Sequence, residues 1–371
     1  MAEIFLFGRL RHAPLLEIVL GRPVAALVRP ARLPGHKPVL AGPRGPVTLI
    51  PDPGGAGAPG LLLGGLTDVE IERLHFYCAV HGAAPLDVTT DGGEATAFVT
   101  QAPEAPKDGA GDFDPDTWQA EGAPHAMLVA VEVMAQYGRW PAKDFGAHRL
   151  KAIETRAAAR LRAPQRARPS RFDLDRDVEL QARTLPYLNF FSVTEVNLRH
   201  RQFDGSMGPV INRAAIGVGD AAIVLPYDPV RDEVLLVQQF RAAPYIAGDT
   251  APWTWEAPAG LVDPGESPET AAYREAEEEA KVRLSRLERV AGAYSSTGSS
   301  TEFSHIFVGI ADLDGAGELG GLEAEGEDIH GEVMAFDAFF DDLQAGRFVN
   351  LQLVTAGLWL ALNRERLRSG G

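Results

Sequence analysis

Residues 260 to 282 read GLVDPGESPETAAYREAEEEAKV, and this stretch decides the fold of the C-terminal half of the chain. Glu275, Glu278 and Glu279 are spaced at i, i+3 and i+4, so a helix would carry all three on one face. Like charges at that spacing repel one another, and the arrangement is costly unless a cation binds there. Hard divalent cations such as Mg²⁺ are bound in proteins through carboxylate oxygens. The spacing therefore predicts an acidic, cation-binding helix.

The start of this helix is clearly signalled in the sequence. Ser267 can cap the helix, Pro268 suits its first position, and Glu269 favours the positive end of the helix dipole. Gly260 and Gly265 bracket the loop that leads into it. We expect a loop followed by a helix that begins at Pro268.

The same stretch resembles the Nudix box, in which glycine, glutamate, an Arg-Glu pair and a Glu-Glu pair recur at fixed spacing. The one departure is Lys281, where the family has a glycine that caps the helix end, so the end of the helix is in doubt. The alternative is an ordinary solvated acidic helix, but the number of matches at fixed spacing favours the box. The matching positions are Gly260, Glu266, Arg274, Glu275, Ala276, Glu278, Glu279 and Val282.

The surrounding sequence resembles the ADP-ribose pyrophosphatase branch of this family, and the resemblance covers nearly all of residues 172 to 367. Five segments carry it, and the last holds three glutamates far downstream of the box: LRHRQFDGSM (198–207), LPYDPVRDEVLLVQQFR (225–241), PWTWEAPAG (252–260), GSSTE (298–302) and GLEAEGEDI (321–329). The family resemblance implies an α/β/α sandwich.

The resemblance also implies the reaction, which is Mg²⁺-dependent hydrolysis of ADP-ribose to AMP and ribose 5-phosphate, with Mn²⁺ as the alternative metal. A bound metal neutralises the pyrophosphate oxygens and lowers the pKa of bound water. Two alternatives stay open, namely another nucleoside diphosphate sugar or dinucleotide as substrate, and a sensor that binds ADP-ribose without hydrolysing it. The second would be favoured if box glutamates were missing, and all are present.

The resemblance assigns roles to residues in the box and in the downstream loop. Glu275 and Glu279 are the first metal ligands by residue type, and the resemblance adds the backbone carbonyl of Ala259 and the carboxylate of Glu327. Glu325 is the expected general base on a loop that closes on substrate, with Glu327 as the alternative. For the loop acids, which also include Glu323, a solvated acidic turn is the competing interpretation. Glu278 and Arg274 complete the expected catalytic set.

Substrate recognition needs cations for the phosphates and a flat apolar surface for the base. Arg241 and Arg213 match phosphate-binding positions of the family, and an arginine fork suits a phosphate. Phe190 matches an adenine-stacking position, although a buried strand aromatic is the commoner use of such a residue. Leu261 and Glu302 are the remaining expected substrate contacts, with the end of a strand as the alternative for Glu302. The family implies a homodimer with shared active sites, in which Phe190 and Arg213 serve the partner.

Composition limits the partners of the chain. Its 371 residues carry 35 basic and 51 acidic side chains, a formal charge of −16, which disfavours nucleic acid and anionic membranes. The N-terminus lacks a secretory signal and the apolar stretch 351–362 is too short to span a bilayer. With one cysteine, Cys78, no intrachain disulfide can form, and we expect a cytoplasmic protein.

Residues 1 to 162 form a separate expected domain, joined by a linker at 163 to 171 to the Nudix hydrolase domain at 172 to 367. Short strands and turns are indicated between residues 29 and 65 by dense proline and glycine, and a helix over 68–80 by apolar spacing. The overall class is therefore α/β, with segregated α+β character in this first domain.

The opening FLFGRLRHAPLLEIVLG resembles the gamma-glutamyl cyclotransferase-like (AIG2-like) family, a mixed β-barrel and helix fold. The family's catalytic glutamate is replaced here by Cys78, and its small hydroxyl loop residue by Arg9. A thiol of ordinary pKa is a poor substitute for a proton-shuttling carboxylate. We expect a non-catalytic relative in which Cys78 is a buried core thiol, with a reactive sensor cysteine as the alternative. Such a fusion resembles the tellurite-resistance-associated ADP-ribose pyrophosphatases.

Overall fold

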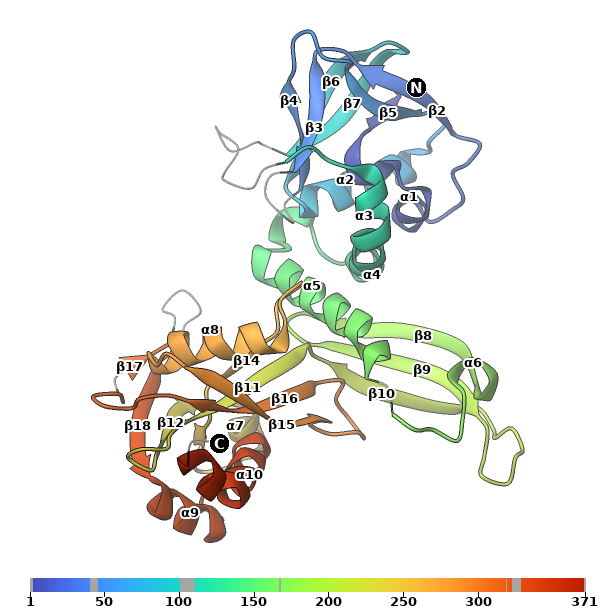
Figure 1. Ribbon diagram of the computed structural model, residues 1–371. Coiled ribbons are helices and arrows are strands. Elements are labelled where there is room, and N and C mark those ends of the chain that lie inside the picture. Colours follow the sequence, from blue (N-terminus) through green and yellow to red (C-terminus); the bar gives the residue numbers. More distant parts are fainter. Residues whose placement is uncertain are drawn as a thin grey trace. The chain divides into compact units, whose positions relative to one another are not determined.

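The computed structural model describes residues 3–40, 46–100, 111–166, 168–317, 319–321 and 328–369. The chain divides into two compact units (Figure 1). Unit 1 comprises residues 1–165 with 188–190, and unit 2 comprises residues 166–187 with 191–371. Each unit has its own buried apolar core. No helix among the described ranges is long and apolar enough to cross a membrane.

Unit 1 combines a five-stranded sheet, ordered β2-β5-β1-β7-β6, with a separate β3-β4 hairpin and a set of helices. Its strands are β1 Ile4–Leu6, β2 Val28–Leu33, β3 His36–Leu40, β4 Val47–Pro51, β5 Ala58–Leu63, β6 Ala83–Thr90 and β7 Gly93–Thr100. Its helices are the 3-10 turn η1 Gly8–Arg11, α1 Ala13–Leu20, α2 Asp68–Val80, α3 Pro115–Glu121, α4 Ala123–Met134 and α5 Ala147–Arg162.

The N-terminal strand shows how the core of unit 1 is divided. Ile4 and Leu6 pack into a cluster with residues of α1, α2, α4 and α5, whereas Phe5 and Phe7 pack into a second cluster with residues of β2, β4, β5 and β7. Successive side chains of a strand point to opposite faces, so one short apolar run serves both clusters. This explains why the run IFLF is continuous rather than alternating.

Unit 2 is built on a larger sheet with the order β15-β16-β11-β12-β18-β17, to which β13 and β14 add through β12 and β11. Its strands are β8 Val178–Leu188, β9 Ser192–His200, β10 Ile211–Gly217, β11 Asp220–Asp228, β12 Glu233–Phe240, β13 Trp253–Glu256, β14 Ala259–Leu261, β15 Arg286–Tyr294, β16 Phe303–Ile310, β17 Leu319–Gly320 and β18 Ile329–Ala335. Its helices are α6 Leu174–Asp177, α7 Ala242–Ala247, α8 Pro268–Ala280, α9 Phe336–Gln344 and α10 Leu351–Arg368.

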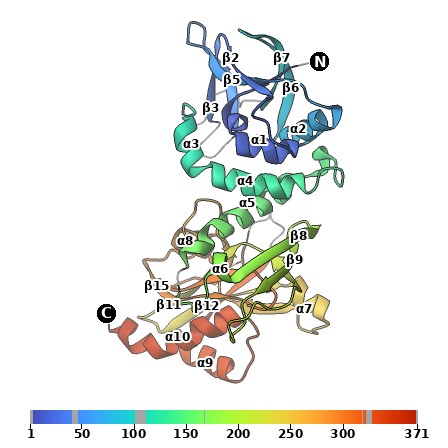
Figure 2. The same ribbon diagram turned by 90° about the vertical axis from the view of Figure 1, so that its right-hand side faces the viewer.

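Strand β11 shows that this sheet is the middle layer of a sandwich. Ala222 and Val224 belong to the cluster that contains the alanines of α8, while Ile223, Leu225 and Tyr227 belong to the cluster that contains α9 and α10. Figure 2 shows α8 on one side of the sheet and α9 and α10 on the other. The expected α/β/α sandwich is confirmed, and the mixed α/β class with it.

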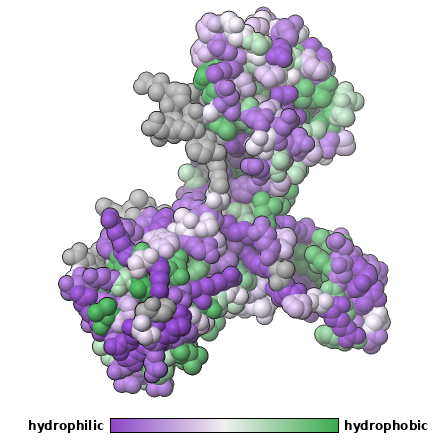
Figure 3. Space-filling view, in the orientation of Figure 1, coloured by the Kyte–Doolittle hydropathy of each residue, from purple (hydrophilic) through white to green (hydrophobic). Residues whose placement is uncertain are grey.

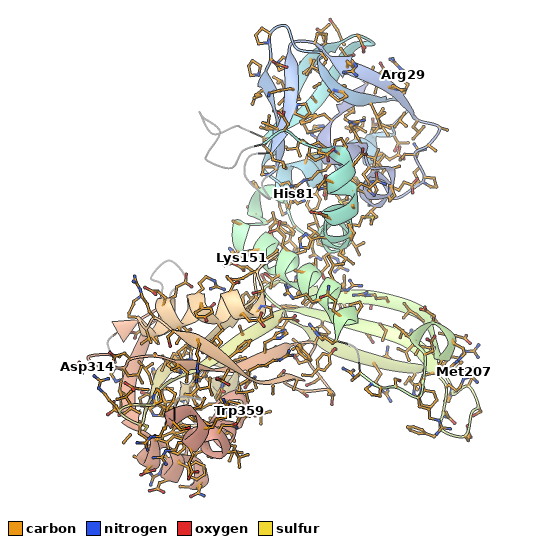
Figure 4. All side chains as sticks on the ribbon, in the orientation of Figure 1. Arg29, His81, Lys151, Met207, Asp314 and Trp359 are labelled. Atoms are coloured by element: carbon orange, nitrogen blue, oxygen red, sulfur yellow. The ribbon has the colours of Figure 1, made fainter. Side chains whose placement is uncertain are left out.

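A three-stranded sheet, β10-β9-β8, precedes this sandwich in unit 2. Strand β10 ends at Gly217 and β11 begins at Asp220, so the two sheets follow one another along the chain. All of residues 179–184 on β8 are exposed, which means that both faces of this strand meet solvent. Figure 3 shows hydrophobic surface on this part of unit 2, and Met207 lies at the tip of the β9–β10 hairpin in Figure 4.

The sequence-based predictions of individual elements are confirmed. The predicted helix over 68–80 is α2, and the helix predicted to begin at Pro268 is α8. The short strands and turns predicted between residues 29 and 65 are β2 to β5 and their connections.

Candidate active site

Helix α8 begins and ends as its local sequence dictates. The Ser267 side chain accepts a hydrogen bond from the Thr270 backbone N–H at 3.0 Å, and Pro268 occupies the first turn. The helix ends at Ala280, and Lys281 adopts the left-handed conformation with φ of 56°. Lys281 thus takes the backbone conformation usually supplied by glycine, which removes the doubt about the helix end.

Small side chains let α8 approach the sheet closely. Ala271, Ala272 and Ala276 are fully buried against β11. Glu275 and Glu279 are buried as well, at 7% and 3% exposure. Buried carboxylates require hydrogen-bond or cation partners, so these two glutamates mark the helix as more than a packing element.

The segment around β14 meets the two buried glutamates. The Ala259 backbone N–H donates to Glu279 Oε2 at 2.8 Å. A β-carbon on Gly260 would lie 1.9 Å from Glu275 Oε1, so only glycine fits beside that carboxylate. The structure therefore brings together three of the four expected metal-binding residues, Ala259, Glu275 and Glu279.

Arg274 ties the remaining box acids together. Its guanidinium donates to both oxygens of Glu266, at 3.0 and 3.1 Å, to Glu278 Oε2 at 3.0 Å, and to Glu275 Oε1. It also donates to the Leu261 carbonyl at 3.1 Å. Burial lowers the pKa of Arg274, but the hydrogen bonds to Glu266 and the charge of Glu275 outweigh it, and the net pKa is raised. The expected catalytic residues Arg274 and Glu278, and the expected contact Leu261, lie in this one cluster.

The donor set of the cluster fits a divalent cation. Arg274 is shared by three carboxylates, and Glu279 lies one turn further along, so negative charge exceeds positive charge among these side chains. Carboxylate and carbonyl oxygens are the ligands that Mg²⁺ and Mn²⁺ take. Within the described part of the chain, no three His, Cys, Asp or Glu side chains are already arranged around one metal position. Instead, Arg274 donates hydrogen bonds to Glu275 and Glu278. A metal ion that bound these carboxylates would replace hydrogen bonds from Arg274.

The loop acids Glu323, Glu325 and Glu327 lie outside the described residues. The chain on either side of them is described. Gly321 N–H donates to the carbonyl of Glu278 at 3.2 Å, and Gly320 pairs with Ile329 between β17 and β18. Gly321 and the paired strands β17 and β18 therefore lie beside the C-terminal end of α8.

Arg241 is held by a residue that sequence reasoning missed. Its guanidinium donates to both oxygens of Glu256, with Nη2 to Oε2 at 2.7 Å, and Thr254 Oγ1 donates to Glu256 Oε1 at 2.6 Å. Glu256 is buried on β13, which pairs with β12, the strand that ends just before Arg241. The sequence signal that could have indicated Glu256 is its place as a lone acidic residue in the apolar run PWTWEAPAG.

Phe190 and Arg213 stand on different parts of the chain. Phe190 occupies the turn between β8 and β9, is assigned to unit 1 and is 53% exposed, so the alternative of a buried strand aromatic is wrong. Arg213 is exposed on β10 in unit 2, and its Nη1 donates to the Asn212 carbonyl at 2.7 Å. Neither residue is part of α8 or of the segment at β14 that leads into it.

Glu302 immediately precedes β16. Its carboxylate Oε1 accepts from Ser304 Oγ at 3.2 Å and from Gln352 Nε2 at 3.4 Å. These bonds hold Glu302 between β16 and the first turn of α10. They explain its position without a ligand.

Cys78 in unit 1 is a core thiol. It is 4% exposed within the helical cluster, and burial raises its pKa. A protonated, buried thiol is a weak nucleophile. The geometry therefore supports the core interpretation and not the sensor.

Comparison with known proteins agrees with the fold and box of unit 2. The family model described as "NUDIX domain" matches residues 218–353. The chain is 39% identical over 193 residues to the ADP-ribose pyrophosphatase of Escherichia coli (strain K12), covering 52% of this chain and 92% of that protein. It is 34% identical over 194 residues to the ADP-ribose pyrophosphatase of Haemophilus influenzae, covering 52% and 89%.

A third relative shares a shorter region. The GDP-mannose pyrophosphatase of Cronobacter sakazakii is 39% identical over 108 residues, which cover 29% of this chain and 56% of that protein. The fold and the box helix together define a hydrolase. The chain belongs to the Nudix family.

Proposed function

We propose that unit 2 hydrolyses the pyrophosphate bond of ADP-ribose, giving AMP and ribose 5-phosphate, with Mg²⁺ as the metal and Mn²⁺ as a substitute. The observation that carries this proposal is the pair of buried carboxylates, Glu275 and Glu279, set against Ala259 and Gly260. Support for the substrate comes from the two ADP-ribose pyrophosphatases that match most of their own length.

In this proposal Glu275, Glu279, the Ala259 carbonyl and Glu327 would hold the metal. Bound there, it would neutralise the pyrophosphate oxygens and lower the pKa of water. Glu325 takes the proton as the oxygen of water bonds to one phosphorus and the other phosphate leaves. Arg274 and Glu278 keep the box carboxylates oriented, since Arg274 already joins three of them.

Substrate contacts follow from the positions of the basic and apolar side chains. Arg241 presents its guanidinium to a phosphate while Glu256 fixes its plane, and an arginine held in this way loses less entropy on binding. Leu261 and Glu302 complete the contacts from the same chain. Phe190 stacks on adenine and Arg213 binds phosphate in the active site of a partner chain.

The homodimer is supported by the exposed three-stranded sheet. A thin sheet that exposes apolar side chains to water is unfavourable, and a second copy of the chain would bury this surface in a dimer interface. The exposed residues include Leu180, Phe203, Val210 and Ile216. A dimer formed through this sheet would bring Arg213 of one chain to the partner chain.

A second substrate class has one observation in its favour. The region shared with a GDP-mannose pyrophosphatase shows that the box and its flanks also occur in a protein named for another nucleoside diphosphate sugar. The box acts on the pyrophosphate and leaves the sugar undetermined. A non-hydrolysing sensor is disfavoured because every box glutamate is present.

Residues 1 to 162, which lie within unit 1, are proposed as a non-catalytic domain, joined by a linker at 163 to 171 to the Nudix hydrolase domain at 172 to 367. Its core thiol and its bulky Arg9 support this proposal. The gamma-glutamyl cyclotransferase-like relationship, the tellurite-resistance type and a cytoplasmic location remain predictions.

The experiment is product analysis of the purified full chain with ADP-ribose and Mg²⁺, beside GDP-mannose and a dinucleotide. We expect AMP and ribose 5-phosphate in equal amounts, and no product after chelation of the metal. Turnover of GDP-mannose alone would support pyrophosphate hydrolysis but would reject ADP-ribose as the substrate. Tight binding of ADP-ribose without turnover would establish the sensor.

A further inference from the structure

Lys281 stands where the Nudix box has glycine, and its backbone is strained. Among the described residues, Asp232 and Lys281 are the non-glycine residues with positive φ, at 63° and 56°. A side chain in this conformation is disfavoured, so it persists only where surrounding contacts hold it. For Asp232 the contacts are plain, because its carboxylate accepts from Tyr227 at 2.8 Å and from Arg368 at 2.7 Å.

The contacts of Lys281 all converge on the last turn of α8. Its Nζ donates to the Glu278 carbonyl at 2.9 Å, and its backbone N–H donates to the Ala276 carbonyl. The carbonyls of a helix's last turn lack helical partners, and a cation beside them is favourable. Lys281 therefore caps the helix with its side chain as well as with its backbone.

Strand β17 and the residue after it, Gly321, contact the same turn of α8. The Glu278 carbonyl also accepts from Gly321 N–H at 3.2 Å, and a β-carbon on Gly320 would lie 1.7 Å from the Glu279 carbonyl oxygen. The backbone of Glu278 and Glu279 therefore contacts Lys281 as well as residues 320–321. The Glu279 carboxylate, on that backbone, accepts from Ala259 at 2.8 Å.

The geometry points to Lys281 as a positioning residue for the metal-binding face: its side chain holds the last turn of α8, and so the Glu279 carboxylate, in place. This inference rests on the proposed function of α8. Lys281 touches neither metal nor substrate. A glycine at this position would relieve the backbone strain but would lack the Nζ contact. Substitution by glycine can therefore distinguish the effect of Lys281 on stability from its effect on the position of Glu279.

Two effects of the lysine charge act in opposite directions and can be told apart. Through space, an ammonium group near the box opposes a divalent cation, so its removal would tighten metal binding. Through positioning, its removal weakens metal binding. Lys281 is exposed, so solvent screens the through-space effect and positioning dominates.

The test compares Lys281→Gly, Lys281→Met and Lys281→Arg in the full chain. Metal affinity is measured without substrate, by titration of the protein with Mn²⁺ followed by electron paramagnetic resonance, and thermal stability is measured by calorimetry. We expect Lys281→Met to melt lower and to bind Mn²⁺ about 5-fold more weakly, the worth of one hydrogen bond. Lys281→Gly should recover the melting temperature but keep the weaker binding, and Lys281→Arg should resemble wild type.

Two results would overturn the inference. The first is tighter or unchanged Mn²⁺ binding in Lys281→Gly, and the second is weakened Mn²⁺ binding in Lys281→Arg equal to that in Lys281→Met. Because Mn²⁺ binding needs no turnover, failure of the wild type to hydrolyse ADP-ribose would reject the proposed function and leave this comparison intact. If the wild-type protein binds no Mn²⁺, both the proposed function and the inference about Lys281 are rejected.

Discussion

Helices α2 and α8 have the same length and similar N-termini, yet they bury different sets of side chains. Both run for 13 residues, and each is capped by a hydroxyl side chain, Thr67 or Ser267. Beyond its first turn, α2 buries large apolar side chains and Cys78, whereas α8 buries alanines and two glutamates. Only α8 gives buried positions beyond its first turn to carboxylates, and this difference separates the candidate catalytic unit from unit 1.

Each helix also buries a glutamate that can be compared directly. Glu70 on α2 accepts from the Thr67 backbone N–H at 2.7 Å and from Arg22, and it completes a capping box. The Arg22 hydrogen bond, followed by the Thr67 backbone, lowers the pKa of Glu70 to about 2. Its contribution to stability is complete above the unfolded pKa near 4.5 and is lost as the pH falls toward 2. Glu70 therefore has a structural role, whereas Glu279 is proposed as a metal ligand.

The largest effect is expected for Gly260→Ala. Its new β-carbon would occupy the place of the Glu275 carboxylate. Displacing one charged group from the reacting centre should lower kcat on the order of 10²- to 10³-fold. Steady-state kinetics with ADP-ribose measures the loss, and Gly111→Ala, where the β-carbon meets nothing within 4 Å, is the control. Normal turnover in Gly260→Ala would show that Glu275 does not need its present position.

Arg274→Met should give the next largest effect, on stability. It leaves Glu266, Glu275 and Glu278 without their shared cation, and we expect the free energy of unfolding to fall by about 2 kcal/mol. Urea denaturation measures the change. Added Mg²⁺ should restore more stability to this variant than to wild type, because it relieves the repulsion. Arg283→Met, which removes an exposed ion pair, should cost less than about 0.5 kcal/mol. Equal costs in the two variants would remove the special role of Arg274.

Glu256→Gln tests the residue that holds Arg241. Loss of the charge-assisted fork lets the guanidinium move, so KM for ADP-ribose should rise by about 10-fold with a smaller change in kcat. Glu332→Gln is the matched control, because Glu332 is an exposed glutamate on β18. An unchanged KM with intact folding would separate Arg241 from substrate binding.

The smallest effect is expected for Cys78→Ala in unit 1. It removes a buried sulfur, which should cost about 1 kcal/mol of stability and leave ADP-ribose hydrolysis unchanged. In wild type the raised pKa and the burial of the thiol should make its labelling by a disulfide reagent slow between pH 7 and pH 9, relative to the unfolded chain. Fast labelling of the native protein would revive the sensor interpretation.

The sequence predicts the box helix well because its signals are local, with Ser267 and Pro268 at the helix start. The sandwich is predicted through the family resemblance, and β11 is an apolar run whose two faces pack into different clusters. The sequence does not predict that Glu256 holds Arg241 or that Lys281 folds back on Glu278, since these contacts depend on where strands and turns meet in three dimensions. The proposed roles of Phe190 and Arg213 cannot be read from the sequence of one chain either, because the proposal places these residues in the active site of a second chain.

The most direct test is a paired assay of Glu279→Gln and Glu70→Gln, two buried glutamates on helices of equal length. AMP formation from ADP-ribose is followed with Mg²⁺, and thermal melts confirm folding. We expect Glu279→Gln to lose AMP formation on the order of 10²- to 10³-fold and Glu70→Gln to retain the wild-type rate with a lower melting temperature. Full activity in Glu279→Gln, or an equal loss in a folded Glu70→Gln, would contradict the assignment of catalysis to the face of α8.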